Sequence, residues 1–351
     1  MIDFGEDRAM TIDMHAHWSP PELIDIYRAR TEPPMIYTDG SGNDIIKTRR
    51  GEQAFGDMFD DLETRLAEMD EHGVATGVLS LWGPHQWIER LPVEESVPAV
   101  RIFNDAVSQV CAGNPGRFVA YASLPLADMD AAVAELDRVM ALPGMIGAIL
   151  PGNAFMTLAD ADAYLPILAA ANRHKAALFI HWGPRPGDEW PRTGMQTDNF
   201  IRRMGTLDMQ ASLSACTVTL TMTDLLDDYP DARFHIHNLG GNVAFEVERL
   251  DHRSLLDTPD EPLPSTRLTK PNLWFDCNSF GAKSIDMAVD LFGVDRIVYA
   301  TDGTAFGCDW TNKALAETSL TDDERDMIRS GNARAMMGHL APFASMAQAA
   351  E

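Results

Sequence analysis

Eight short apolar runs, separated by longer stretches with helical spacing, constrain the fold of this chain more than any other feature. Bounded apolar runs of this length are typical of buried β-strands. Between them apolar side chains recur three or four residues apart, as at Leu62, Leu66 and Met69, which is the spacing of one face of a helix. The predicted strands are Met10–His15, Val74–Leu81, Phe118–Ser123, Met145–Leu150, Ala176–His181, Ala232–His237, Leu273–Asp276 and Arg296–Ala300.

Repeated alternation of strands and helices predicts a parallel sheet, and eight strands predict a closed (β/α)8 TIM barrel. Helix punctuation agrees, because Asp128 is a predicted N-cap and Gly73 a predicted helix terminator. An open doubly wound sheet is the competing architecture, but no GxGxxG motif follows any run, so nucleotide binding has no support. We expect residues 1–351 to form a single barrel domain with an inserted loop at about 31–55.

Two long loops interrupt the strand and helix pattern, at Thr31–Phe55 and Asp257–Pro271. The first is polar, rich in glycine, and carries Lys47, Arg49 and Arg50. Loops of this length in a compact domain are usually functional or mobile. We therefore expect the first loop to contribute to a binding site.

Composition and charge narrow the class of protein. Hydrophobic residues make up 45% of the chain, yet no stretch reaches the ~18 apolar residues of a membrane helix. The N-terminus is acidic and lacks the features of a secretory signal. The 53 acidic residues outnumber the 28 basic ones, for a formal net charge of −25, and such a surface repels nucleic acid and anionic membranes. We expect a cytoplasmic protein with no nucleic-acid or membrane partner.

Four cysteines are widely spaced and form no CxxC motif, which argues against a zinc ribbon or a redox motif. In the cytoplasm reduced thiols are the default. Cys308 is close in sequence to Asp302, a candidate site residue, but a nucleophilic cysteine is the weaker interpretation.

The end of the first predicted strand carries His15-Ala16-His17. Residues i and i+2 of a strand point to the same side, and at the carboxyl end of a barrel strand that side can face the active-site mouth. Imidazole suits Zn²⁺, Mn²⁺ or Fe²⁺. An isolated HxH is more often a chance pair of hydrogen-bonded or surface histidines, so this motif needs support from other residues.

That support comes from polar residues at the ends of later runs. His181 ends the fifth run, His237 ends the sixth, and Asp302 follows the eighth. In a barrel these positions converge on one pocket although they are remote in sequence. The residues taken together predict a metal site, whereas each one alone is equally consistent with a purely structural role.

Together these residues resemble the amidohydrolase superfamily, in the branch that contains α-amino-β-carboxymuconate-ε-semialdehyde decarboxylase and related aromatic-acid decarboxylases. The resemblance runs nearly end to end. Its segments are Ile12–His17, Arg65–Val74, Asn104–Asp105, Asn114–Phe118, Leu124–Asp128, Gly240–Gly241, Thr301–Gly303 and Ser330–Ala333.

The resemblance implies a (β/α)8 barrel with one divalent metal, held by His15, His17, His181 and Asp302. Zn²⁺ is the first expectation and Mn²⁺ the second, since three imidazoles and a carboxylate suit either. A water, hydroxide or substrate oxygen would complete the coordination. The implied reaction is decarboxylation of an aromatic or unsaturated carboxylic acid, with Asp302 and His237 as acid and base. The resemblance also implies a homo-oligomer, a dimer or larger.

The sixth strand departs from the family pattern. Alignment on the double glycine puts Asn238 at the position of the family's catalytic histidine, with His237 one residue earlier. A one-residue offset reverses the face of a strand residue. We favour His237, because the last residue of a strand need not keep strict alternation, but Asn238 stays open as the pocket residue. The segments at Thr301–Thr304 and His181–Pro186 also differ from relatives, which leaves the substrate contacts there open.

Substrate-binding residues are predicted from chemistry alone. Arg49, Arg50 or Arg185 could hold a second carboxylate through bidentate hydrogen bonds. A planar substrate could stack on Trp182 or on one of three further tryptophans, which are Trp82, Trp87 and Trp190.

Two other functions remain open. One is a metal-dependent hydrolase of a C–N, lactone or C–C bond, which needs the same ligands. The other is a catalytically inactive binding barrel.

Overall fold

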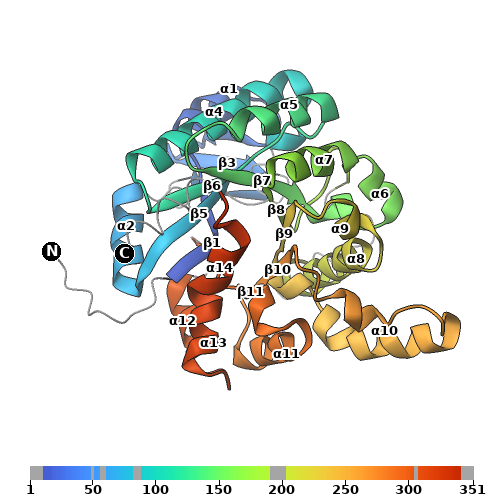
Figure 1. Ribbon diagram of the computed structural model, residues 1–351. Helices are drawn as coiled ribbons and strands as arrows, with labels where there is room; N and C mark the ends of the chain where they lie inside the picture. Colours follow the sequence, from blue (N-terminus) through green and yellow to red (C-terminus); the bar gives the residue numbers. More distant parts are fainter. Residues whose placement is uncertain are drawn as a thin grey trace.

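The computed structural model describes residues 11–48, 51–55, 61–81, 88–189, 203–303 and 307–340. Eight parallel strands form one sheet in the order β1-β5-β6-β7-β8-β9-β10-β11, inside a ring of helices (Figure 1). The N–H of Met14 donates to the carbonyl of Tyr299 (3.0 Å) and joins the first strand to the last. The predicted (β/α)8 barrel is confirmed. The strands are β1 Thr11–Trp18, β5 Val74–Leu81, β6 Phe118–Ala122, β7 Met145–Pro151, β8 Ala177–His181, β9 Arg233–Ile236, β10 Leu273–Asp276 and β11 Ile297–Val298.

Helices follow the strands as their spacing predicted. The Asp128 side chain accepts a hydrogen bond from the N–H of Ala131 (2.9 Å) and caps α5. Gly73 ends α2 with a left-handed φ of 70°, which glycine adopts without steric cost. The helices are α1 Glu22–Ala29, α2 Leu62–His72, α4 Val93–Gly113, α5 Met129–Val139, α6 Leu158–Asp162, α7 Leu165–His174, α8 Met209–Thr221, α9 Leu225–Asp228, α10 Val243–Asp257, α11 Ala282–Phe292, α12 Gly307–Ala316, α13 Asp322–Asp326 and α14 Asn332–Met337.

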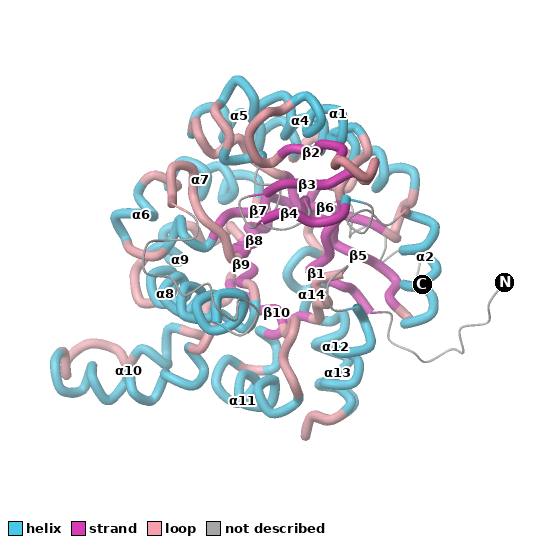
Figure 2. Tube along the Cα trace, turned by 180° about the vertical axis from the view of Figure 1, so that it is seen from behind, coloured by secondary structure: helices cyan, strands magenta, loops and turns pink. Residues whose placement is uncertain are grey.

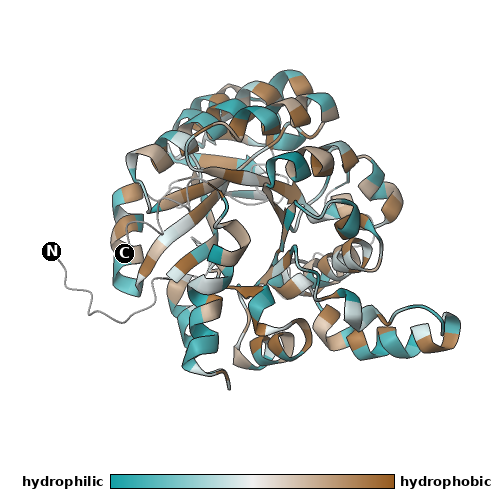
Figure 3. Cartoon of the chain, in the orientation of Figure 1, coloured by the Kyte–Doolittle hydropathy of each residue, from teal (hydrophilic) through white to brown (hydrophobic). Residues whose placement is uncertain are grey.

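Alternating side chains of the strands build two apolar layers. On β8, Ala177 and Phe179 face the barrel interior, whereas Leu178 and Ile180 pack against the surrounding helices. In Figure 3 the central strands are mostly apolar, while the helices around them alternate between polar and apolar residues. This two-sided burial explains why the strand sequences are continuous apolar runs.

The segment Thr31–Phe55, expected to be a loop, instead contains a three-stranded antiparallel sheet. Its strands are β2 Met35–Thr38, β3 Asp44–Thr48 and β4 Gly51–Ala54. This sheet lies beside α1 (Figure 2), and Ile36 and Ile46 are its buried anchors. The expectation was wrong because strands this short and polar lack a continuous apolar run.

The second predicted loop, Asp257–Pro271, contains only the short 3₁₀ helix η6 (Pro264–Arg267). It follows α10, which projects from the ring of helices in Figure 1. Across the described part of the chain, no helix is both long enough and apolar enough to span a bilayer.

Candidate metal centre

A β-bulge in β1 turns the two histidines of the first strand into the barrel. Asp13 pairs with Gly77 and Ala16 with Leu79, so three residue steps of β1 oppose only two of β5. Before the bulge Ile12 and Met14 face the interior, and after it Ala16 packs outward. An extra residue in a strand reverses which side chains face each side, so His15 and His17 point inward. The Asp13 carboxylate stabilises the bulge by accepting a hydrogen bond from the N–H of His15 (3.2 Å).

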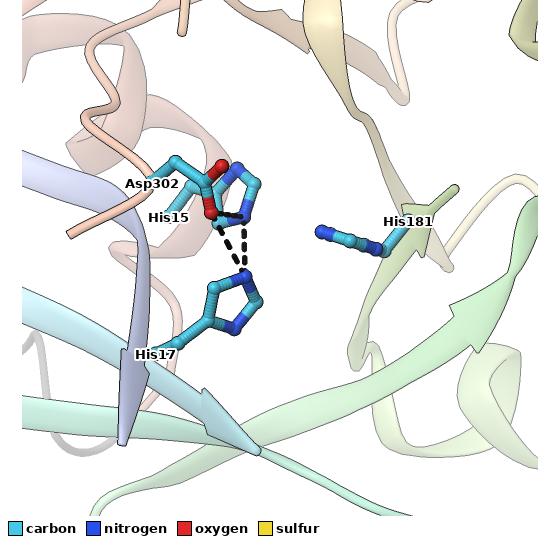
Figure 4. Close-up of side chains that lie close together, drawn as sticks. All are labelled: His15, His17, His181 and Asp302. Atoms are coloured by element: carbon cyan, nitrogen blue, oxygen red, sulfur yellow. Dashed lines mark hydrogen bonds and ion pairs between the residues drawn. The ribbon is translucent and has the colours of Figure 1, made fainter. Parts of the chain in front are cut away.

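Four predicted ligands converge at the carboxyl ends of the strands. The Nε2 atoms of His15 and His17 lie 3.0 Å apart, and Asp302 Oδ1 is 3.2 Å from the first and 3.0 Å from the second. His181, at the end of β8, faces this group from across the barrel (Figure 4). One ligand atom from each of the four residues lies within 4.8 Å of all the others. Ligand atoms about 3 Å apart are what bonds of roughly 2.0–2.2 Å to one ion require.

The opposite ring nitrogen of each histidine is bonded to a fixed acceptor. The Nδ1 atom of His15 lies 3.2 Å from Asp276 Oδ2, and that of His17 lies 3.1 Å from the carbonyl of Leu81. The Nδ1 of His181 lies 2.8 Å from the carbonyl of Trp182. Such acceptors hold the proton on Nδ1 and leave the Nε2 lone pair for a metal. The residues present therefore fit a divalent cation.

The charges of the centre also favour a cation. Burial lowers the pKa of His15, but the nearby Asp302 and Asp276 carboxylates outweigh burial and raise it to about 10. Burial lowers the pKa of His17 and of His181, which keeps both rings neutral. Neutral imidazole is the form that binds a metal. Carboxylates that attract a proton to His15 equally attract a metal cation.

His237, and not Asn238, has its side chain against the predicted ligands. Phe234 and Ile236 of β9 pack outward, so His235 and His237 both face inward. The His237 ring stacks on His181 with centroids 4.3 Å apart. Burial lowers its pKa to about 3.

Asn238 lies just beyond the strand in a left-handed conformation (φ 52°). Its amide oxygen accepts a hydrogen bond from the amide of Asn278 (3.0 Å). Glycine follows at Gly241, where a Cβ would lie 2.4 Å from the carbonyl of Gln210, so the turn after Asn238 needs glycine there.

Asp276 is a site residue that the sequence interpretation missed. Its Oδ2 atom lies 3.2 Å from His15 Nδ1 and 3.2 Å from His235 Nε2, and its Oδ1 accepts from the N–H of Asn238 (2.8 Å). The other ring nitrogen of His235 lies 3.1 Å from the Tyr121 hydroxyl. A buried hydrogen-bond chain thus connects the barrel interior to His15. Asp276 ends an apolar run, as His181 does, and that pattern could have identified it.

The predicted substrate contacts are only partly placed. Arg49, Arg50 and three of the tryptophans (Trp82, Trp87 and Trp190) lie outside the described residues. The Trp182 side chain is almost fully buried at the mouth, and the backbone N–H of Trp182 donates to His237 Nδ1 (3.4 Å). Arg185 is bonded to the carboxylates of Asp160 and Asp188, which occupy its guanidinium.

Cys308 is buried, and burial raises its thiol pKa to about 12. The four cysteines are all free and buried. A thiol with so high a pKa is a poor nucleophile at neutral pH, so the weaker interpretation of Cys308 gains nothing from the structure.

A (β/α)8 barrel with three histidines and an aspartate converging at the carboxyl ends of its strands is the architecture of a metal-dependent barrel enzyme. The Amidohydrolase family model matches residues 12–338. The chain therefore belongs to the amidohydrolase family, as the sequence resemblance predicted.

Two curated relatives and one solved structure illustrate the likeness. The gamma-resorcylate decarboxylase of Rhizobium sp. (strain MTP-10005) is 26% identical over 294 residues, which cover 79% of this chain and 87% of that protein. The 2-amino-3-carboxymuconate-6-semialdehyde decarboxylase of Dictyostelium discoideum is 23% identical over 304 residues, covering 84% and 82%. The crystal structure of a dihydroxybenzoic acid decarboxylase from Polaromonas sp. JS666, with bound manganese and 2-nitroresorcinol, superposes with a TM-score of 0.73 at 20% identity, covering 93% and 96%.

Proposed function

We propose that this protein is a metal-dependent carboxy-lyase that decarboxylates an aromatic or unsaturated carboxylic acid. The observation that carries the proposal is the convergence of His15 Nε2, His17 Nε2 and Asp302 Oδ1 at 3.0–3.2 Å. Relatives named for decarboxylation of resorcylate and carboxymuconate semialdehyde support the reaction type. The substrate partner is a small carboxylic acid.

We assign the metal to His15, His17, His181 and Asp302. Zn²⁺ remains the ion predicted from the donor set, and Mn²⁺ is the ion bound in the Polaromonas structure. Such a cation acts as a Lewis acid that polarises a bound oxygen and stabilises developing negative charge.

Acid–base chemistry falls to His237 and Asp302 in this proposal. The His237 ring is fixed by stacking on His181 and by the N–H of Trp182. From that position it can hold a proton and deliver it to the carbon that loses its carboxyl group. Asp302 lies across the cluster from His181 (Figure 4) and is the second group able to transfer a proton there. Arg49, Arg50, Trp182 and Asn238 stay predicted substrate contacts.

Metal content and CO₂ release test this function together. The purified full chain is analysed for metal, stripped with a chelator, reloaded with Zn²⁺ or Mn²⁺, and incubated with a panel of hydroxybenzoates and unsaturated diacids. We expect CO₂ release that depends on reloading. Hydrolysis products without CO₂ from amide or lactone substrates would instead establish the hydrolase alternative. If the protein neither contains nor binds metal, the inactive binding barrel is the remaining interpretation.

A further inference from the structure

A small hollow opens at the carboxyl ends of β5, β6, β7 and β8. Its volume is about 20 Å³, which is room for one water-sized group. His181 lines both this hollow and the candidate metal centre, so the two adjoin. The remaining lining residues are Leu81, Glu89, Arg90, Ser123, Ile149, Leu150, Pro151 and Trp182.

Ser123, directly after β6, is one of the residues that line this hollow. Its side chain is fully buried, and its Oγ bonds to no group among the described residues. Both backbone polar groups of Ser123 are hydrogen-bonded to the Asn104 side chain. The Ser123 N–H donates to Asn104 Oδ1 (3.0 Å), and Asn104 Nδ2 donates to the Ser123 carbonyl (3.0 Å). Asn104 is in turn held by the Glu135 carboxylate (2.8 Å). The backbone that carries this Oγ is thus fixed in position.

Glu89, in the 3₁₀ helix η2 (Ile88–Arg90), lines the same hollow. Its Oε1 lies 3.1 Å from Arg90 Nη1. Arg90 is fixed by donating to the carbonyl of Pro184. The other oxygen, Oε2, is buried and accepts no hydrogen bond from any described residue. Burial of two polar atoms without partners is costly, and native proteins rarely leave such atoms unsatisfied.

We propose that Glu89 and Ser123 form a substrate subsite that selects acids with a hydrogen-bond-donating substituent, of which a ring hydroxyl is the chief case. A carboxylate only accepts hydrogen bonds, whereas a serine hydroxyl accepts or donates. A hydroxyl on the substrate therefore satisfies both side chains at once. The hollow has room for one such group, and Leu81, Ile149 and Leu150 are among the residues that line it. The inference rests on the proposed function, whose substrate class it names.

Two variants test the subsite in opposite ways. Ser123→Ala deletes one partner of the substituent. Glu89→Gln keeps the shape of the side chain, and its carbonyl oxygen stays against Arg90, so an NH₂ group replaces Oε2 at the hollow. The subsite then donates instead of accepting.

Binding to the metal-loaded full chain is measured by calorimetry, and turnover by CO₂ release. The probes are benzoates that carry hydroxyl, amino, fluoro or nitro at each ring position in turn. At one ring position the unmodified protein should favour hydroxyl and amino over fluoro about tenfold. Ser123→Ala should lose most of that ratio. Glu89→Gln should invert it towards nitro, which only accepts.

Ser96→Ala is the matched control, because Ser96 in α4 also has a fully buried hydroxyl without a described partner but does not line the hollow. Ser123→Ala and Ser96→Ala should unfold at nearly the same temperature as the unmodified protein. Glu89→Gln weakens the pair with Arg90 and should unfold at a lower temperature, so its native fold at the assay temperature is checked by circular dichroism. Unchanged hydroxyl preference in both Ser123→Ala and Glu89→Gln would overturn the subsite and indicate a buried water in the hollow. A preference that shifts in binding without CO₂ release from any probe would support the subsite and refute decarboxylation. CO₂ release with an unchanged substituent preference in both variants would support decarboxylation and refute the subsite.

Discussion

At the scale of single residues, the bulge in β1 determines whether a metal site can exist. Without the extra residue, the inward alternation of Ile12 and Met14 would continue to Ala16, and His15 would face the helices. The i, i+2 spacing correctly predicted that His15 and His17 share a side. Their position at the end of a barrel strand also predicted that this side faces the active-site mouth. The bulge that turns them inward could not be predicted, because it depends on pairing with a strand more than fifty residues away.

His17→Ala should abolish metal retention and leave the barrel folded. The substitution removes one of four ligands, and the cavity it leaves lies at the mouth, outside the apolar layers. We expect metal content after dialysis to fall at least about tenfold, with an unchanged far-UV circular dichroism spectrum. His252→Ala, at an exposed position of α10, is the control. Normal metal content in His17→Ala would overturn the ligand assignment.

Asp276→Asn should weaken metal binding without removing a ligand. The amide can no longer hold the proton on His15 Nδ1 as the carboxylate does at 3.2 Å. Loss of such an outer partner typically costs about 10–100-fold in metal affinity. Competition with a chelator measures the affinity. Asp227→Asn, which removes an exposed pair with Lys270, is the control; an equal affinity in both variants would show that Asp276 does not position His15.

At the scale of elements, the sequence predicted the buried strands of the barrel and missed the more exposed strands of the small sheet. All eight barrel strands were predictable, because burial on both faces requires long apolar runs. Helix α2 followed from its apolar spacing and its terminator Gly73, and the start of α5 followed from the N-cap Asp128. Strands β2, β3 and β4 were not predictable, since Ile36 and Ile46 are the buried apolar residues of β2 and β3 and their neighbours are polar or partly exposed.

The packing of α5 on α4 should depend on pH through Glu135. This carboxylate accepts hydrogen bonds from Arg138 (2.7 and 2.9 Å) and from Asn104 (2.8 Å). Burial raises the pKa of Glu135, but these donors outweigh burial and lower it below its ordinary value of 4.5. A depressed folded-state pKa gives stability that is present above 4.5 and is lost as the pH falls through the folded-state value.

Glu135→Gln should therefore cost about 2 kcal/mol of unfolding free energy at neutral pH, and much less in strong acid. Urea unfolding at about pH 7 and about pH 3 measures the difference. Glu317→Gln, at an exposed position 3.9 Å from Lys313, should have little effect at either pH. A cost for Glu135→Gln that stays the same at both pH values would contradict the assigned pKa.

At the scale of the whole molecule, the candidate centre joins the first strand of the barrel to the segment after the last. His15 and His17 lie on β1, and Asp302 follows β11. The same junction is closed by the Met14–Tyr299 backbone bond and by Thr301, whose N–H (3.1 Å) and hydroxyl (2.6 Å) both donate to Asp13. A metal bound to His15, His17 and Asp302 would therefore stabilise the closure of the barrel as well as the site.

Metal removal should accordingly lower the thermal stability of the protein. An ion at about 100 times its dissociation constant stabilises a folded protein by about 2.7 kcal/mol, which corresponds to a few degrees in unfolding temperature for a chain of this size. Scanning calorimetry of stripped and reloaded protein measures the shift. His17→Ala should show no shift on metal addition, and a shift of full size in that variant would place the ion elsewhere.

The junction between β1 and the segment after β11 also determines when the candidate centre can assemble during synthesis of the chain. Asp13 and Thr301 are 288 residues apart in the chain, so the contact they make forms only after the C-terminal part has been synthesised and has reached the first strand. A nascent or truncated chain carries His15 and His17 but has no Asp302 to meet them. The four-residue centre is therefore complete only after the C-terminal segment has docked on the first strand.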